Sequence, residues 1–379
     1  MKADILIHGG TVIDPARGIH EQRDVAIRHG KFLEIPMGEP VEAGQILPAQ
    51  DHIVTPGLID LHAHINYLGS ANGLPGDTFC LPNGVTAVAD AGSIGVSNYR
   101  ALLHQTDAWM VKTRFFINVS AGGQIMSKHF PEPLDPSKWE DELFQKAFED
   151  GRGRILGLKV RTSKKVVGEL GLKPLKAAIE LARRFSMPLV VHPTDPPVPM
   201  GELAELLDPG SILCHIFQGV GMTCIENGHL SEGLLQARER GVIYDVAHGR
   251  LNFSFPVART ALNLGLEPDT ISTDASQANW NKTPMVSLPV VMGKFLAMGM
   301  SLDRVIEKVT CNPARILGQA GKWGTMAPGT CADAAIIKIQ NRPVIYQDCF
   351  GNEQPGEQVL SVRATILDGK LVYRAAEMM

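Results

Sequence analysis

The sequence predicts an α/β protein built on a (β/α)8 TIM-like barrel, with a small composite β-sandwich domain formed by both ends of the chain. Two observations predict this. Between the ends, eight apolar runs of strand length, most of them separated by helical patterns, occupy about 260 residues, the length and period of such a barrel. At the two ends, short alternating runs are broken by turn residues.

The terminal segments read as strands. In the N-terminal part these are residues 5–7, 11–13, 25–27 and 32–35, and in the C-terminal part residues 334–337, 361–367 and 371–373. Asp368-Gly369 marks a hairpin turn between the last two. Neither end could bury a sheet face alone, so we expect them to pair. The predicted division is residues 1–53 and 323–379 for the β domain and 54–322 for the barrel.

The predicted barrel strands are residues 58–64, 85–90, 114–120, 155–160, 188–192, 211–216, 242–246 and 270–274. Helical patterns cover residues 172–185, 200–207, 230–240, 284–298 and 312–317. A doubly wound open sheet is the structural alternative. It would need a glycine-rich fingerprint after its first strand, but residues 63–66 read Ala-His-Ile-Asn.

Composition narrows the class of function. Hydrophobic residues make up 44% and charged residues 20% of the 379 residues, and the net charge is -4. No positive field is available to hold a nucleic acid or an anionic membrane, so we expect a small-molecule substrate. No apolar run matches a secretory or membrane segment, and the six cysteines form no CxxC pair. We therefore expect a cytoplasmic protein with reduced thiols, and a homo-oligomer.

Metal-capable side chains stand at or near the ends of five predicted strands. They are His62, His64, Lys159, His192, His215 and Asp274. The carboxyl ends of barrel strands form the active-site face, so these residues should meet there. His62 and His64 are two residues apart and should point the same way. An isolated pair is a weak signal, but the coincidence at the ends of five strands predicts a metal site.

Lys159 lies in the apolar run Gly157-Leu158-Lys159-Val160-Arg161. An ammonium group there would cost several kcal/mol unless it were paired, and it would repel neighbouring cations. A lysine that has added carbon dioxide resolves this conflict, because a carbamate is an anionic ligand able to bridge two metals. The alternative is a lysine paired with Asp or Glu. Cys214 adjoins His215, so strand alternation predicts that its thiol faces the opposite side and packs.

Three segments carry a resemblance to a known family. Residues 54–64, Val-Thr-Pro-Gly-Leu-Ile-Asp-Leu-His-Ala-His, look like the opening motif of the amidohydrolase superfamily, and residues 312–314 and 326–333 resemble its closing motifs. The lysine and histidines of strands 4 to 6 are similar to those of the dihydroorotase and hydantoinase branch. Over its whole length, the sequence looks most like a deacetylase-type subgroup of that branch.

The resemblance implies two divalent ions, zinc in that branch, bridged by a carboxylated lysine. His62, His64 and Asp274 would hold the more buried ion, His192 and His215 the more exposed one, and Lys159 would stand between them. Two departures matter. Dihydroorotases carry an arginine two residues after the histidine pair, where this chain has Asn66, and single-metal deaminases carry a glutamate beyond the strand-5 histidine, where this chain reads Pro-Thr-Asp-Pro-Pro.

The sequence thus predicts a metal-dependent hydrolase that cleaves an amide or cyclic-amide C–N bond with a metal-activated water. Asp274 would accept the proton of that water and pass it to the leaving nitrogen. Arg161 and His248 are weaker candidates for substrate binding. The alternatives are a deacetylase or esterase acting on small acylated carboxylic acids and, more remotely, a non-catalytic assembly protein.

Overall fold

A computed structural model describes residues 1–125, 129–282 and 286–378. Its centre is a seven-stranded sheet in which every pair of neighbours is parallel, in the order β16-β13-β12-β11-β10-β9-β8. The strands are β8 (Leu58–Ala63), β9 (Val85–Ala91), β10 (Lys112–Asn118), β11 (Ile155–Arg161), β12 (Leu189–His192), β13 (Ile212–Leu213) and β16 (Ile243–Tyr244). These seven strands lie within seven of the eight predicted runs, apart from differences of one or two residues at their ends.

The eighth predicted run closes the barrel without forming a regular strand. Residues 270–275 make isolated parallel bridges on both sides, Asp245 to Thr270 and Ala63 to Ala275. On the side of β16, the His248 N–H donates to the Ser272 carbonyl at 3.1 Å. On the side of β8, the His64 N–H donates to the Ala275 carbonyl at 2.9 Å. The predicted (β/α)8 barrel is therefore confirmed.

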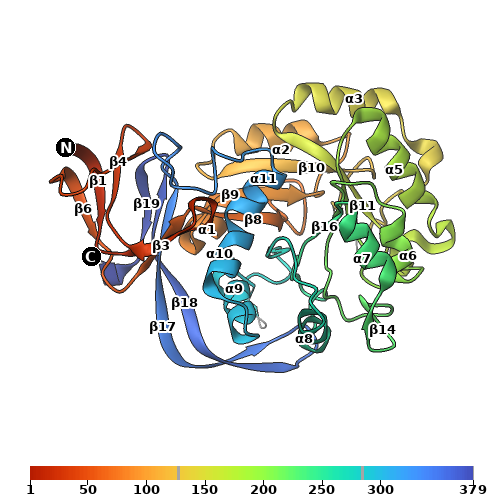
Figure 1. The fold of residues 1–379 in the computed structure, drawn as a ribbon. Coiled ribbons are helices and arrows are strands. Elements are labelled where there is room, and N and C mark those ends of the chain that lie inside the picture. Colours follow the sequence, from red (N-terminus) through yellow and green to blue (C-terminus); the bar gives the residue numbers. More distant parts are fainter. Residues whose placement is uncertain (126–128, 283–285, 379) are drawn as a thin grey trace.

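Helices cover the outside of the barrel (Figure 1). They are α1 (Gly76–Cys80), α2 (Tyr99–Thr106), α3 (Asp141–Asp150), α4 (Lys164–Val167), α5 (Lys173–Phe185), α6 (Met200–Glu205), α7 (Glu232–Glu239), α8 (Phe255–Asn263), α9 (Leu288–Ala297), α10 (Leu302–Val309) and α11 (Cys311–Ile316). All five predicted helices are present with shifted ends. Of the predicted run 284–298, residues 284 and 285 lie outside the described residues. No helix in the described ranges is long and apolar enough to cross a membrane.

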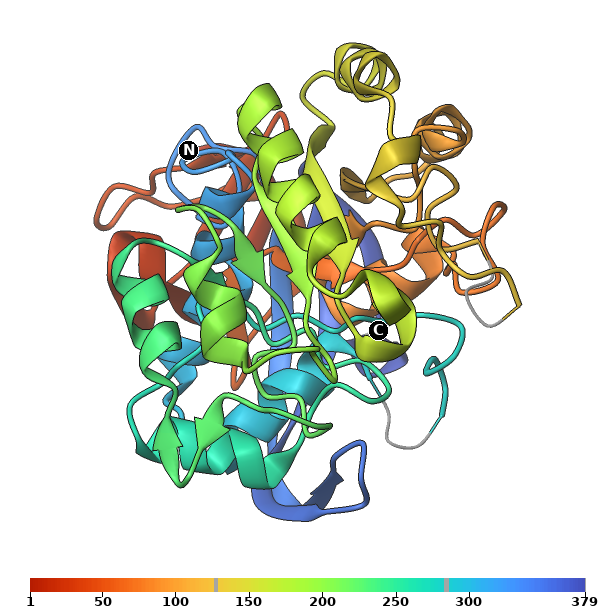
Figure 2. The same ribbon diagram turned by 90° about the vertical axis from the view of Figure 1, so that its right-hand side faces the viewer.

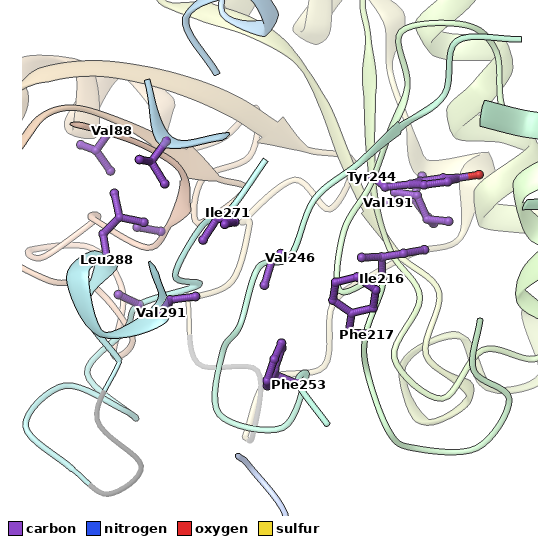
Figure 3. Close-up of a cluster of buried hydrophobic side chains, with 14 of the residues drawn as sticks. Val88, Val191, Ile216, Phe217, Tyr244, Val246, Phe253, Ile271, Leu288 and Val291 are labelled. Carbon is purple, nitrogen blue, oxygen red and sulfur yellow. The ribbon is translucent and has the colours of Figure 1, made fainter. Parts of the chain in front are cut away.

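Two apolar layers position the strands. The outer layer, between strands and helices, forms one buried cluster, and Figure 3 shows part of it: Leu288 and Val291 of α9 with Ile271, Val246 and Phe217. The inner layer fills the barrel itself. Its buried members are Ile59, Leu61, Ala87, Ala89, Phe116, Val190, Ile212, Cys214, Ala247, Ala314 and Leu317. This packed interior leaves the loops at the carboxyl ends of the strands as the place for a site.

Both ends of the chain build two small sheets, beside which both termini lie (Figure 1). One sheet has the order β5-β4-β1-β6, from β1 (Lys2–His8), β4 (Val25–Arg28), β5 (Lys31–Leu33) and β6 (Glu42–Pro48). The other has the order β19-β18-β17-β7-β2-β3, from β2 (Thr11–Asp14), β3 (Ile19–Gln22), β7 (Ile53–Pro56), β17 (Ala334–Gln347), β18 (Glu353–Leu367) and β19 (Lys370–Arg374). The two ends pair as predicted, since Lys31 forms an antiparallel bridge with Cys331 and the Phe32 N–H donates to the Thr330 carbonyl at 3.2 Å. The division at residues 53/54 and 322/323 stays a proposal.

Strands β17 and β18 are much longer than predicted and form an arm. The arm runs from the small sheets under the barrel towards α8, and its end projects at the bottom of Figure 2. Asp348 at its tip is buried and accepts hydrogen bonds from the backbone N–H groups of Phe255 and Phe350, both at 2.8 Å. The arm therefore supports the chain that leaves the last barrel strands. A separate short hairpin consists of β14 (Ile225–Glu226) and β15 (His229–Leu230).

Candidate active site

The residues predicted from strand ends do converge at one end of the barrel. His64 Nε2 lies 3.1 Å and His62 Nε2 lies 3.7 Å from Asp274 Oδ1. Ligand atoms of these three residues lie within 4.8 Å of one another, as a metal site requires. The closing segment causes this proximity, because the Asp274 N–H donates to the His62 carbonyl at 2.7 Å.

Two further histidines complete the cluster. The ring centroids of His62 and His215 are 5.2 Å apart, and those of His215 and His192 are 4.3 Å apart. Burial lowers the pKa of His62 and of His192 well below the usual range, and lowers the pKa of His215 to about 3. The three imidazoles are therefore neutral near pH 7, which is the form that binds a metal ion.

His215 supplies the test of whether a metal fits. Its Nδ1 lies 2.7 Å from the Ala247 carbonyl, and only a protonated Nδ1 can donate to a carbonyl oxygen. The other nitrogen, Nε2, therefore carries a lone pair, and it is buried with no hydrogen-bond partner among the described residues. A buried acceptor without a donor is costly, and a metal ion would satisfy it. The donor set fits a divalent metal.

Lys159 is buried, and its Nζ has one hydrogen-bonding contact, the Cys214 Sγ at 3.7 Å. Across the described ranges no carboxylate oxygen lies within 4.0 Å of it, so the alternative of an ion-paired lysine is not found. Gly92 makes room for the side chain. A Cβ at Gly92, whose φ is +92°, would stand 2.6 Å from Lys159 Cγ.

Cys214 lies inside the barrel, where its Sγ is within 4.8 Å of ligand atoms of His62 and Asp245. The prediction that it faces away from the site was wrong. Regular strand structure ends at Leu213, and His215 has a left-handed backbone with φ of 54°. The alternation of side chains therefore breaks between Cys214 and His215, and both reach the site.

Three carboxylates lie near the histidines: Asp60 and Asp245 are buried, and the side chain of Asp274 is 13% exposed. Burial would raise the pKa of Asp274, but the hydrogen bond from His64 and the nearby His62 and His215 lower it overall. Burial raises the pKa of Asp60 to about 7 and that of Asp245 to about 6. Asp60 accepts from the Thr273 N–H at 3.0 Å and so ties the first strand to the closing segment.

Arg161 and His248, the two weaker candidates, differ in position. Arg161 lines the site cavity, but its guanidinium pairs with Glu132, whose side chain is 1% exposed. His248 is fully buried and is not among the residues that line the cavity. Its Nε2 lies 2.7 Å from the Nζ of buried Lys294, and its Nδ1 lies 2.9 Å from the Gly249 carbonyl. Substrate contact by either residue stays a prediction.

A cavity of about 420 Å³ opens over the cluster. Its lining includes His62, His64, Lys159, His192 and Asp274, and also Asn72, Gln124, Arg161, Ser163, Lys165, Thr194, Asp195, Arg250, Asn252, Ser276 and Asn279. Sequence reasoning missed Asn252 and Thr194. Both stand in loops after predicted strands, but neither residue type nor spacing distinguished them from other loop residues.

Comparison with known proteins gives consistent results. Residues 53–372 match the model of the Amidohydrolase family. The chain is similar to a deacetylase of Agrobacterium fabrum, with 30% identity over 86% of this chain and 81% of the relative. Among solved structures, it resembles an adenine deaminase (TM-score 0.90, 27% identity, 98% of this chain and 100% of the other) and a dihydroorotase (TM-score 0.89, 26% identity, 98% and 99%).

Replacing Gly92 by Ala tests the space that Lys159 occupies. The new Cβ would collide with the lysine stem, so we expect Gly92→Ala to displace Lys159 and to lower the metal content of the purified protein. Strain at positive φ and overpacking should also lower the free energy of unfolding by about 1–3 kcal/mol. Metal analysis and denaturant unfolding measure the two effects.

The matched control is Gly153→Ala. Gly153 also has a positive φ of +77°, but nothing lies within 4 Å of the position that a Cβ would take there. We expect a similar backbone penalty and unchanged metal content. Equal metal content in Gly92→Ala and Gly153→Ala would contradict the steric account of the Lys159 site.

Proposed function

We propose a binuclear metal hydrolase function for this chain, which belongs to the amidohydrolase family. The hydrolytic class follows from the family, and the finer proposal is cleavage of an amide or cyclic-amide C–N bond. The observation that carries it is the buried cluster itself: His215 Nε2 has a lone pair and no donor, and Lys159 has no acidic partner within reach among the described residues. Divalent cations would satisfy the lone pair of His215, and a carbamate on Lys159 would replace an unpaired ammonium group by an anion that binds these cations.

His62, His64 and Asp274 would hold one ion, and His192 and His215 the other. Lys159, carrying carbon dioxide as a carbamate, would bridge them, and we propose Zn²⁺ as the metal because nitrogen and oxygen ligands suit it. Such ions, when bound, lower the pKa of a water molecule towards neutrality and polarise the substrate carbonyl.

Asp274 moves the proton in this proposal. Its pKa is lowered, so the carboxylate is ionised at neutral pH and can accept the proton of the attacking water. The same proton then passes to the leaving nitrogen while the C–N bond breaks, since an amide anion is a poor leaving group. The apolar interior beneath the cluster excludes bulk water from below.

The alternative within the same chemistry is a deacetylase or esterase acting on small acylated carboxylic acids. The similarity to an Agrobacterium fabrum deacetylase favours it. Three cationic side chains, Arg161, Lys165 and Arg250, line the cavity and suit a carboxylate on the substrate. Asn66, which replaces the arginine of dihydroorotases, is buried and does not line the cavity, so we expect dihydroorotate to be a poor substrate.

We also propose that the chain works as a homo-oligomer on a small-molecule substrate. A non-catalytic assembly protein would purify without metal, whereas the proposed enzyme should carry about two ions per chain. Turnover of cyclic imides, N-acyl amino acids, acyl esters and adenine by the purified protein separates amide, imide and ester hydrolysis from hydrolytic deamination.

Lys159→Ala should lower the metal content and abolish turnover, because it removes the bridging anion. A small carboxylate such as formate or propionate should restore part of the activity by occupying the vacated space. Metal analysis and rate measurements with and without the added acid test this. Full metal content and full turnover in Lys159→Ala would contradict the carbamate.

Asp274→Asn should lower kcat by at least about 100-fold, because an amide cannot accept a proton at neutral pH. The fold should stay intact by circular dichroism, since the replacement preserves the size of the side chain. Steady-state kinetics on the best substrate decide the matter. A kcat near that of the wild type would exclude Asp274 as the proton acceptor, whatever the metal content.

Variants of Arg161 test whether this side chain binds a carboxylate on the substrate. Removing the guanidinium alone would leave the buried Glu132 unpaired, so the variant to use is Arg161→Met combined with Glu132→Gln. We expect KM to rise about 10-fold for substrates with a carboxylate, the effect of a lost charge-assisted hydrogen bond, and to stay unchanged for neutral ones. An equal effect on both kinds of substrate would assign Arg161 a structural role.

A further inference from the structure

The two carboxylate oxygens of Asp274 have different partners. Oδ1 faces the histidine pair, with His64 Nε2 at 3.1 Å. Oδ2 faces the other way and accepts a hydrogen bond from Asn252 Nδ2 at 2.9 Å. Rotation of the carboxylate by half a turn would exchange the two oxygens, so the bond to Asn252 distinguishes them.

The orientation of the Asn252 amide follows from its neighbours. An ionised carboxylate only accepts hydrogen bonds, so the amide NH₂ must face Asp274. The amide oxygen then faces Thr194, whose hydroxyl donates to it at 2.8 Å. Asn252 and Thr194 are 7% and 8% exposed, so little water competes for these bonds.

Gly249 lets the loop approach Asp274. Its φ is +56°, and a Cβ there would collide with Asp274 Oδ2 and stand 2.6 Å from Asn252 Nδ2. Any other residue would separate the amide from the carboxylate. The Gly249 N–H also donates to the Thr273 carbonyl at 2.9 Å, which attaches this loop to the residue before Asp274.

We propose that Asn252 is a positioning residue that holds Asp274 Oδ2 in the orientation from which it transfers protons, while Oδ1 stays on the ligand side. Thr194 acts through Asn252 by fixing its amide. This inference rests on the proposed hydrolase function, because it assigns a task to the oxygen that the histidines do not contact. Asn252 uses its carbonyl and one N–H within the protein, as a positioning residue does, and because it also lines the cavity the KM of the variant separates this role from substrate binding.

The kinetic test is a double-mutant cycle. Asn252→Ala should lower kcat about 10- to 100-fold and leave KM within about twofold, as expected when an interaction needed only for the chemical step is lost. Thr194→Val should lower kcat about 3- to 10-fold, whereas Thr194→Ser, which keeps the hydroxyl, should have the kcat of the wild type. In the Asn252→Ala background, Thr194→Val should cause no further loss of kcat. The matched control is Asn263→Ala, an exposed asparagine at the end of α8, which should leave kcat unchanged.

A second readout does not depend on turnover. In crystal structures of the purified wild type and Asn252→Ala, we expect the Asp274 carboxylate to rotate or to occupy two orientations only in the variant, with equal metal content. If the wild type hydrolyses none of the screened substrates, the proposed function fails, and the crystal comparison still tests the restraint. An unchanged carboxylate, additive kinetic effects, or a rise in KM without a loss of kcat would each overturn the assignment of Asn252.

Discussion

The site depends on how the barrel closes. Residues 270–275 form no regular strand, yet they bond to the chain on both sides, and this brings Asp274 against the histidines of the first strand. Two buried carboxylates hold the segment there: Asp60 accepts from Thr273, and Asp245 accepts from the hydroxyls of Thr270 and Ser272. The contacts that close the barrel therefore also bring His62, His64 and Asp274 together. These are three of the six residues predicted to bind metal.

Closure of the barrel leaves a buried nitrogen acceptor of the site without a hydrogen-bond donor among the described residues. Four histidines, Lys159 and Asp274 lie at one end of the barrel, and burial favours the neutral form of His62, His192 and His215. Among the described residues, the lone pair of His215 Nε2 is buried without a donor, a state that costs free energy in the folded chain. The backbone is strained in the same place, since His215 and Asp274 both have positive φ. Strained backbone together with an unsatisfied buried acceptor is typical of a site that binds cations.

The sequence predicted the metal-capable residues at the ends of apolar runs, including His215 and Asp274 on irregular backbone, and missed the side on which Cys214 lies and the loop residue Asn252. Strand ends are visible as apolar runs, so the pattern alone could place His62, Lys159 and His192 together. Cys214 could not be placed, because a left-handed residue follows it. Asn252 could not, because its role depends on a loop that folds back onto Asp274. The length of the arm was missed for a related reason: about half of residues 338–360 are charged or amide residues, and the segment contains two prolines and two glycines and lacks the apolar alternation by which the other strands were recognised.

The arm connects the small β sheets to the chemistry. Its tip holds the chain after β16 at several points: Asp348 accepts from the Phe255 N–H, the Cys349 N–H donates to the Phe253 carbonyl, and Lys294 bridges the Gln347 carbonyl and His248. Residues 248–255 thus lie between the arm and Asp274, and they include Gly249 and Asn252, which lie against Asp274 Oδ2. A barrel alone would leave this loop supported on one side only. Through the arm, the terminal strands therefore also restrain the loop that contacts Asp274 Oδ2.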